Sequence, residues 1–406
     1  MLRLKLNTLL GKQSLHKILR SLTVLGIETS CDDTGAAIVD DTGQVLAQEI
    51  HSQQQMTIRL GGVIPPIARR LHEENIERVV TATIESSNIP VEQLDGIACT
   101  VKPGMPLSLL VGLKYARELV RRAKNVPFLP VHHMQAHALT VRMVDRVAFP
   151  FLVFLLSGGH CLLAIVKDVE DFMLLGESID TSPGEAYDKV ARRLKLKNLP
   201  ECDGMSGGES VERVARRGDP HKFVDRYPAT MSKYRDCNFS FSGMKTTTMR
   251  LIEREEEKHG IVGDGILPNV CDVAAAFQLS VGRHLLKRLQ RCLVFIDYND
   301  LLPKHNRTLV LSGGVACNSF IRQVIGQLCD HHEYDLVCPP PQLCTDNGVM
   351  VAWNGMEKLK VGKGIASDPE LVDIEPKCSI GPSMIRKVQE ANIQVPRFKI
   401  DLTKFS

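Results

Sequence analysis

The sequence has no apolar run long enough to cross a membrane. Its longest run, from Val147 to Leu156, is about half of the ~20 residues that a transmembrane helix needs, and Ser-Gly-Gly-His follows it directly. We interpret this run as a buried strand. The chain also has no low-complexity tract, and its composition, 44% hydrophobic and 24% charged, is typical of a globular protein. Its 406 residues are enough for two or three domains.

Paired cysteines of the CxxC type are also missing, although the chain has 12 cysteines. A chain of this length needs no disulfides to hold its core together, so we expect free thiols in a reducing compartment. A zinc site built from cysteines is correspondingly disfavoured.

Acidic residues are absent before Glu28, whereas leucines alternate there with the basic residues Arg3, Lys5, Lys12, Lys17 and Arg20. A basic, amphipathic and acid-free leader is typical of a mitochondrial presequence, and a basic disordered tail is the alternative. We expect residues 1–23 to be a targeting segment. Without these five cations the formal charge falls from +3 to about −2, so a nucleic-acid partner would need a local basic patch.

Segments with strand and helix character alternate along the rest of the chain. Strands are expected at 24–30, 34–40, 43–50, 94–100, 127–132, 149–156, 161–168, from 308, and at 334–340. Helices are expected at 66–87, 106–123, around the histidines at 133–139, and at 185–196, 210–217, 273–295, 320–332 and 346–360. The alternation predicts an α/β protein, which we divide into an N-terminal domain (24–148), a C-terminal domain (149–360) and an extension (361–406).

Three expected strands end in polar turns: IETSCDDT at 27–34, LLSGGH at 155–160 and VLSGGVACN at 310–318. Gly-Gly after a strand lets backbone N–H groups close on an anion. One such turn is weak evidence, because tight turns also use glycine for steric reasons. Three of them resemble two facing domains that hold a nucleotide.

The histidines of VHHMQAHAL (131–139) form the first candidate site. His133 and His137 are four residues apart, so a helix places both rings on one face. A zincin protease needs Glu after the first of these histidines, and Met134 stands there instead. The pair can hold a metal only with a third ligand, and a coincidental pair in a core or on a surface is the alternative.

Asp346, in CTDNGVM, is a candidate for that ligand. It lies at the start of an expected helix, where a carboxylate is also an ordinary N-cap. A His–His–Asp set suits iron, zinc or a similar ion with positions open to a substrate oxygen.

Charged clusters complete the candidates. Glu28, Asp32 and Asp33 follow the first strand, and Glu185, Asp188 and Lys189 open a helix, where acids also complement the helix dipole. Two helical runs are the densest in positive charge after the leader. They are solvated faces or a phosphate-backbone patch, and they contain Lys114, Arg117, Arg121, Arg122, Lys124, and Lys189, Arg192, Arg193, Lys195, Lys197.

Ten segments, in order between residues 24 and 355, together resemble one family, the tRNA threonylcarbamoyladenosine transferases (TsaD and its relatives, formerly called O-sialoglycoprotein endopeptidases). The segments are VLGIETSCDDTGAAIVD, GGVIPPIARRLHEENI, PGMPLSLLVGLKYAREL, HHMQAHAL, LLSGGH, GESIDTSPGEAYDKVARRL, NFSFSGMKT, DVAAAFQ, LSGGVACN and CTDNGVMVAWNG. With the basic leader, the resemblance is to the mitochondrial members.

The resemblance implies a fold and a reaction. The fold is the two-domain α/β fold of actin, hexokinase and Hsp70 (ASKHA), with a nucleotide in the cleft between the domains. The reaction transfers a threonylcarbamoyl group from threonylcarbamoyl-AMP to N6 of the adenosine beside the anticodon in tRNAs that read ANN codons, and AMP leaves. A separate synthase is expected to supply threonylcarbamoyl-AMP, and the protein is expected to be a homodimer in the mitochondrial matrix, without membrane attachment.

The resemblance also implies roles for single residues. His133, His137 and Asp346 would bind one divalent cation per subunit, with iron or zinc favoured. Asp32 is proposed as the base or orienting group for the incoming N6. Contacts to the acyl-adenylate are expected from Leu155, Leu156, Ser157, Gly158, Gly159, Asp188, Gly208, Glu212, Cys317, Asn318 and Thr345.

The chain departs from the family pattern at two points. Lys102-Pro103-Gly104 replaces Gly-Pro-Gly, which adds a charge able to reach a phosphate, and Ser206-Gly207-Gly208 replaces Gly-Gly-Pro. Three other functions stay open on the residues alone: an ATP-dependent small-molecule kinase of the same superfamily, a metalloprotease, and a nucleotide-binding scaffold without catalysis.

Overall fold

The computed structural model describes residues 21–60, 62–124 and 126–405, so the expected targeting segment lies almost wholly outside the described residues. Within these ranges, every helix is too short or too polar to span a lipid bilayer. The chain forms two compact units. Unit 1 contains the described residues up to Gln53, Val63–His133 and Asn347–Pro376; unit 2 contains Gln54–Gly62, Met134–Asp346 and the residues from Lys377. The domain boundaries expected after residues 148 and 360 stay predictions.

A mixed five-stranded sheet forms the centre of unit 1. It consists of β1 (Thr23–Glu28), β2 (Asp33–Asp40), β3 (Val45–Ser52), β4 (Gly96–Lys102) and β5 (Phe128–His132). The order is β3-β2-β1-β4-β5; β1, β2 and β3 are antiparallel neighbours, and β4 and β5 run parallel to β1. These strands confirm those expected from the sequence.

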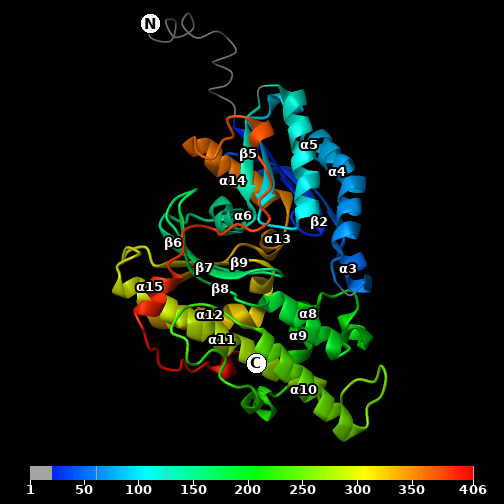
Figure 1. Cartoon of the computed structure of the whole chain (residues 1–406), viewed down its shortest axis with the longest axis vertical. Coiled ribbons are helices and arrows are strands. Elements are labelled where there is room, and N and C mark those ends of the chain that lie inside the picture. The colour runs from blue at the N-terminus through cyan, green and yellow to red at the C-terminus, as the bar shows by residue number, and fades with distance from the viewer. Residues whose placement is uncertain (1–20, 61, 125, 406) are drawn as a thin grey trace, which may run out of the picture. The chain divides into compact units, whose positions relative to one another are not determined.

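Helices cover both faces of this sheet (Figure 1). On one face, α4 (Pro65–Ser87) and α5 (Pro106–Ala123) pack side by side on Leu25 and Ile27. On the other face lies α14 (Gly348–Val361). Gly26 allows this approach, since a Cβ at Gly26 would lie 2.2 Å from the backbone nitrogen of Ala352. Each fully buried aliphatic side chain of such a core contributes about 1.5–3 kcal/mol.

Unit 2 repeats the same sheet topology. Its strands are β6 (Phe151–Leu156), β7 (Cys161–Val166), β8 (Phe172–Glu177), β9 (Thr308–Ser312) and β10 (Asp335–Val337). The order is β10-β9-β6-β7-β8; β6, β7 and β8 are antiparallel neighbours, and β9 and β10 run parallel to β6. The sequence predicts the β6–β7 hairpin, β9 and β10, but not β8.

Four helices of unit 2 lie between β8 and β9. They are α8 (Pro183–Arg193), α9 (Gly207–Ala215), α10 (Ser242–His259) and α11 (Val270–Tyr298); α12 (Ser319–His332), α13 (Pro341–Cys344) and α15 (Ile385–Glu390) follow. Phe154 and Leu156 face a core with Tyr187 and Phe277 on this side of the sheet. Alternate β6 residues such as Leu155 face α6 (His133–Leu139) and α7 (Val141–Val144), while α3 (Gln54–Leu60) buries none of its residues. The sequence analysis did not anticipate α3 or α10.

The C-terminal extension, from residue 361 onward, is called the strap here. Its residues up to Pro376 belong to unit 1 and those from Lys377 belong to unit 2. In unit 1, Glu375 donates its N–H to the carbonyl of Val101 at 3.0 Å, and Lys102 pairs with the Glu375 carboxylate at 3.6 Å. The lysine that departs from the family pattern therefore binds this strap. In unit 2, the N–H of Met384 donates to the carbonyl of Leu174.

Candidate active site and metal centre

Helix α6 carries both histidines and begins at His133, directly after β5 ends at His132. Its Met134, Ala138 and Leu139 pack in a core of unit 2, and His133 is the last residue that belongs to unit 1. His133 and His137 are buried, with 5% and 1% of their surfaces exposed. The position that a zincin protease reserves for its general base is thus filled by a packing methionine.

His133 is oriented by residues at the end of β1. Its Nδ1 lies 3.0 Å from Ser30 Oγ and 3.3 Å from Glu28 Oε2. The Glu28 carboxylate, 1% exposed, also accepts hydrogen bonds from the Ser30 N–H and from Thr100 Oγ1 at 2.7 Å. With Nδ1 held in this way, Nε2 is the nitrogen left to bind a metal. Sequence reasoning noted Glu28 but missed this role, because the contact joins residues 105 positions apart and no local pattern indicates it.

His137 contacts the third expected ligand. Its Nε2 lies 3.0 Å from Asp346 Oδ1, and the Asp346 side chain is 25% exposed. The alternative, that Asp346 is an ordinary helix cap, does not hold: the N-cap of α14 is Asn347, whose Oδ1 accepts from the Met350 N–H at 2.8 Å. Asp346 stands one residue outside the helix, where its carboxylate is available to a cation.

The three residues fit a divalent metal ion. One donor atom each from His133, His137 and Asp346 lie within 4.8 Å of one another. Two imidazole nitrogens and one carboxylate oxygen are a set that iron and zinc accept, with positions left open for a substrate oxygen. The arrangement favours a metal site over a coincidence of spacing in the histidine pair.

Asp32 lies half-buried in the turn between β1 and β2. Backbone contacts hold this turn: the carbonyl of Cys31 accepts from Ser108 Oγ at 3.1 Å and lies 3.0 Å from His72 Nε2. Thr34 Oγ1 contacts the other nitrogen of His72 at 2.7 Å. The turn is therefore fixed in shape, and the base role of Asp32 stays a prediction.

The expected adenylate contacts gather around loops of unit 2. Leu155 and Leu156 are fully buried in β6, whereas Gly158 and Gly159 of the following turn are exposed. Ser182, the N-cap of α8, donates its hydroxyl to the carbonyl of Gly158. Any contact to a ligand thus comes from the turn backbone and not from the leucine side chains.

A second group of these residues joins α8, α9 and α12. Asp188 packs against Gly207, because a Cβ added at Gly207 would lie 2.4 Å from Asp188 Oδ1. Glu212 accepts a hydrogen bond from the Ser319 N–H at 3.1 Å. Asn318 caps α12 and donates from Nδ2 to Gln278 Oε1 at 3.0 Å. Gln278 and Ser319 are the members of this group that the sequence did not reveal.

The Ser206-Gly207-Gly208 departure has a structural reason. Ser206 is the N-cap of α9 and forms a capping box with Glu209, in which each side chain accepts from the other residue's backbone N–H. Space for a Cβ is open at Gly208. The serine therefore stabilises the helix start without filling the space beside Gly208.

Cys317 and Thr345 flank this group. The S–H of Cys344 donates to the Cys317 sulfur, which lowers the pKa of Cys317 below its ordinary value. Thr345 is exposed directly after α13. Both therefore present polar atoms next to Asn318 and Asp346 in sequence.

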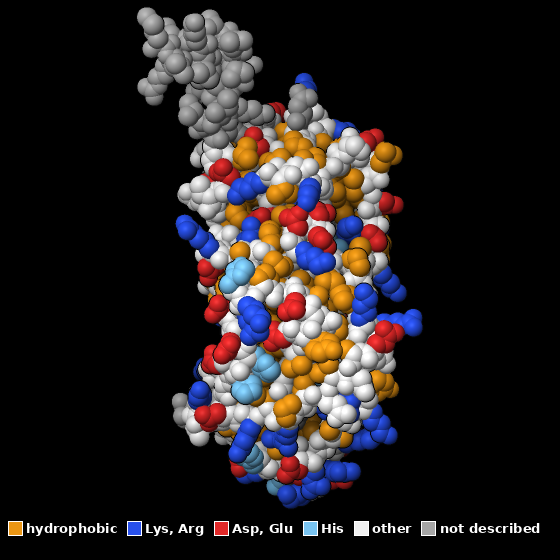
Figure 2. All heavy atoms as spheres, turned by 90° about the vertical axis from the view of Figure 1, so that its left-hand side faces the viewer, with side chains coloured by type: hydrophobic (Ala, Val, Ile, Leu, Met, Phe, Trp, Pro, Cys, Tyr) orange, Lys and Arg blue, Asp and Glu red, His pale blue; other side chains and the backbone are white. Residues whose placement is uncertain are grey.

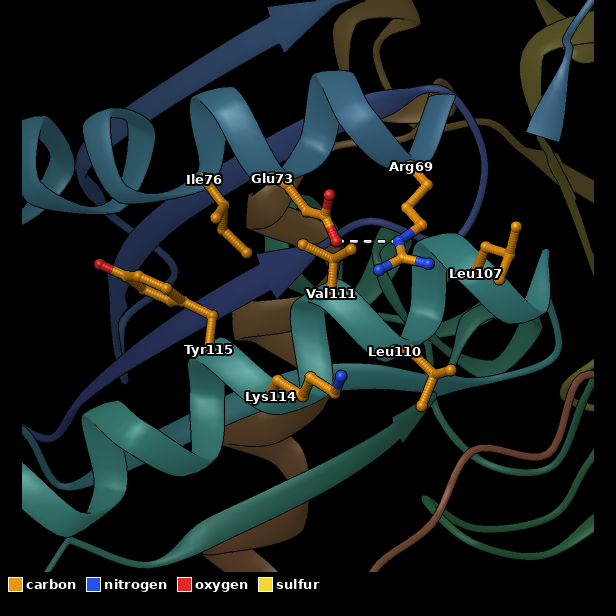
Figure 3. A pocket seen from close by; sticks show the side chains of 8 residues that line it. All are labelled: Arg69, Glu73, Ile76, Leu107, Leu110, Val111, Lys114 and Tyr115. Atoms are coloured by element: carbon orange, nitrogen blue, oxygen red, sulfur yellow. Dashed lines mark hydrogen bonds and ion pairs between the residues drawn. The ribbon is translucent and has the colours of Figure 1, made fainter. Parts of the chain in front are cut away.

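A pocket of about 360 Å³ lies in unit 1 between α4 and α5, and Figure 3 shows its lining. Ile76 of α4 and Leu107, Leu110 and Val111 of α5 line it, and Arg69 pairs with Glu73 at 2.8 Å. None of its eight lining residues is an expected site residue. It is an apolar groove between helices rather than part of the candidate site.

Two sheets of equal topology, with glycine turns after strands, define an α/β protein of the actin and hexokinase fold class. Its His–His–Asp cluster could hold a metal ion. The same fold is seen in T. kodakarensis HypF, with a TM-score of 0.51, 13% identity, and coverage of 87% of this chain and 49% of that chain. This likeness confirms the expected fold class.

Sequence comparison identifies the family. The family model described as "TsaD: tRNA N6-adenosine threonylcarbamoyltransferase" matches residues 44–353. The chain is 48% identical to the mitochondrial tRNA N6-adenosine threonylcarbamoyltransferase of Homo sapiens over 392 residues, which cover 97% of this chain and 93% of the human protein. It is 40% identical to the Wolbachia pipientis wMel protein over 338 residues, covering 83% and 93%. The chain belongs to the tRNA N6-adenosine threonylcarbamoyltransferase family.

Proposed function

We propose that the protein transfers the threonylcarbamoyl group from threonylcarbamoyl-AMP to N6 of the adenosine beside the anticodon in mitochondrial tRNAs that read ANN codons. The family membership, over most of the chain, carries this proposal. The His133, His137 and Asp346 cluster supports it, because a small-molecule kinase of this fold does not explain such a set. The kinase alternative receives no support from the relatives, which are named as transferases.

The reaction assigns tasks to the protein's own residues. N6 of the adenosine attacks the carbamoyl carbon, the new N–C bond forms, and the C–O bond to the phosphate breaks, so that AMP leaves with the bonding electrons. Asp32 accepts the proton that N6 loses. The exposed N–H groups of the Gly158–Gly159 turn bind the acyl-adenylate, while Asp188 and Glu212 accept from ribose hydroxyls.

The metal cluster would bind one divalent ion, iron or zinc by its donor set, which supplies positive charge to a substrate oxygen. Glu28 and Ser30 fix the ring of His133 for this purpose. Cys317, Asn318 and Thr345 border the adenylate on the side of α12 and α13.

Transfer RNA must be held by local basic groups. On the face in Figure 2, Lys and Arg side chains are interspersed with Asp and Glu side chains. Part of each basic run is paired internally: Arg117 binds the carbonyl of Pro369, Arg121 binds Glu370, and Arg193 and Lys195 both bind Glu256. The cations left for phosphates are the exposed ones, Lys114, Arg122, Lys124, Arg192 and Lys197.

Four further assignments belong to the proposal. A separate synthase supplies threonylcarbamoyl-AMP, the protein acts in the mitochondrial matrix, residues 1–23 direct it there, and it works as a homodimer. The mitochondrial names of the animal relatives support the location. The apolar groove between α4 and α5 is a surface on which a second subunit can pack.

The test is transfer of labelled threonylcarbamoyl from threonylcarbamoyl-AMP to an ANN-decoding mitochondrial tRNA, with wild type and His137→Ala side by side. We expect label on the tRNA with wild type and little with the variant. A parallel reaction with γ-labelled ATP and no tRNA tests the kinase alternative. Folded, metal-loaded wild type that leaves the tRNA unlabelled would contradict the transferase proposal.

A further inference from the structure

A second pocket, of about 380 Å³, lies in unit 2 beside α11, where residues between Ser280 and Gln290 line it. Its walls come from residues 224–230, from α11 and from residues 395–398 of the C-terminal strap. Figure 1 shows the red end of the chain passing beside α11. The volume falls within the ~300–1,000 Å³ of small-molecule sites. No residue expected at the active site lines this pocket.

Three cations line the pocket. Arg283 and Lys287 are four residues apart on one face of α11, and Arg397 comes from the strap. Within the described ranges, none of the three forms a hydrogen bond or ion pair with a protein group. Burial, and next the charge of Arg397, lower the pKa of Arg283, while burial and the charges of Arg288, Arg291 and Arg235 lower that of Lys287.

Neighbouring arginines of the same helix behave differently. Arg288 donates to the backbone carbonyls of Met231 and Asp236, and Arg291 donates to that of Asp236. These guanidinium groups hold the chain segments together, so their burial has a structural reason. Arg283 and Lys287 have no such partners, although they are half-buried in the same region.

One uncharged polar atom in the pocket also lacks a protein partner. Gln290 is only 3% exposed, and its Oε1 has no hydrogen-bond partner in the described part of the chain. Such a buried group is destabilising when nothing binds it. His284 accepts at Nε2 from the Ser240 N–H at 3.2 Å, which places its proton on Nδ1 as a donor. Tyr227, Met244 and Phe398 add apolar surface.

We propose that this pocket binds a small phosphomonoester, with the phosphate between Arg283, Lys287 and Arg397 and an apolar or aromatic body against Tyr227 and Phe398. Asp225 is the acid that lines the same pocket, so three cations and one carboxylate leave two positive charges, which a phosphate dianion balances. Gln290 binds a hydroxyl or amine of the body. This site is separate from the proposed transferase site and does not rest on the proposed function.

The ligand also has a structural consequence within unit 2. Phosphate bridges α11 to the strap, whose far end is bonded to α12 through Gln327 and the backbone of Asp401. Bound ligand therefore holds residues 395–401 against the helices. We expect protection of these backbone amides from hydrogen exchange to increase when the site is filled.

Calorimetry with the full chain tests the proposal, with phenyl phosphate as the probe and inorganic phosphate and phenol as its two halves. We expect phenyl phosphate to bind at least about tenfold more tightly than either half, because charge and apolar contacts act together. Arg283→Gln and Lys287→Gln should each weaken binding about tenfold, whereas Arg254→Gln, an exposed cation of α10, should leave it unchanged.

Thermal melting separates a binding role from a structural one. Because Arg283 has no protein partner and faces other cations, Arg283→Gln without ligand should keep or raise the melting temperature. A lower melting temperature, equal binding by Arg283→Gln, or no phenyl phosphate binding by folded wild type would each overturn the proposal. Direct binding of a 5′-phosphorylated oligonucleotide, with no binding of phenyl phosphate, would also overturn it in favour of a nucleic-acid surface.

Discussion

The two units use one sheet topology for opposite purposes at the turn after the first strand. In unit 1 the β1–β2 turn is rich in side chains, and Glu28 and Ser30 bind the ring of His133. In unit 2 the equivalent β6–β7 turn is exposed backbone at Gly158 and Gly159. One copy of the fold thus positions a candidate metal ligand through side chains, and the other exposes backbone N–H groups of the kind that bind anions. The equivalence of the topologies does not extend to the chemistry.

The largest effect should come from unit 1. Glu28→Gln keeps the shape of the side chain but removes the charge beside His133 Nδ1. We expect metal affinity to fall about 10–100-fold, as loss of a carboxylate behind a ligating histidine typically causes. Metal titration of wild type and variant measures this, with exposed Glu92→Gln as the control. Equal affinities would show that Glu28 has only a packing role.

A glycine pair tests the turn of unit 2. A Cβ at Gly158 meets no atom within 4 Å, so Gly158→Ala should fold normally and weaken acyl-adenylate binding about tenfold. Gly313→Ala is the contrast: its φ is +98° and a Cβ would lie 2.4 Å from the carbonyl oxygen of Leu156. That variant should lose about 1–3 kcal/mol of stability in chemical denaturation. Unchanged affinity in Gly158→Ala would remove the turn from the binding site.

The candidate site shows which features a sequence can reveal. Strand–helix alternation and the i, i+4 histidines are local patterns, so the sheets, α6 and the His133, His137 and Asp346 cluster could be predicted. Two contacts join distant segments, and no local pattern indicates them: Glu28 contacts His133, and Asn318 contacts Gln278. The N-cap alternative at Asp346 stayed open because two adjacent residues, Asp346 and Asn347, can both cap a helix. β8 was missed because Phe172–Glu177 lacks alternation.

A smaller effect is expected on the stability of unit 2 at low pH. Arg193, and then Lys195, lower the pKa of Glu256 from 4.5 to about 2. A lowered carboxyl pKa stabilises the fold above pH 4.5, and this contribution is lost as the pH falls from about 4.5 through about 2. Glu256→Gln should cost about 1–3 kcal/mol at pH 7.

Urea unfolding at several pH values measures this difference. It should shrink steadily below pH 4.5, because the wild-type carboxylate then becomes protonated. A difference that stays constant down to pH 3 would mean that Glu256 acts by packing and not by charge.

The smallest effect concerns the thiols. The hydrogen bond with Cys344 stabilises the thiolate of Cys317. Cys317 should therefore react with iodoacetamide faster at neutral pH than the other half-buried cysteines, which are Cys31, Cys271, Cys338 and Cys378. Peptide mapping after brief labelling tests this. Cys344→Ala should slow the reaction of Cys317, and labelling that is uniform across these cysteines would contradict the assignment.

The position of α14 has a consequence for biosynthesis. The five strands of the first sheet are all made by residue 132, but the helix that covers one of its faces begins at residue 348. At ribosomal rates of ~5–20 residues per second, α14 is synthesised roughly 10–40 s after the sheet, and until then that face of the sheet is not covered by it. During that interval Val24, Ala98 and Leu129, which meet Gly355 in the finished protein, belong to an incomplete layer. Synthesis of unit 1 begins first but is completed only when α14 has been made. A nascent chain of this protein should therefore depend on a holding chaperone until its last quarter has emerged.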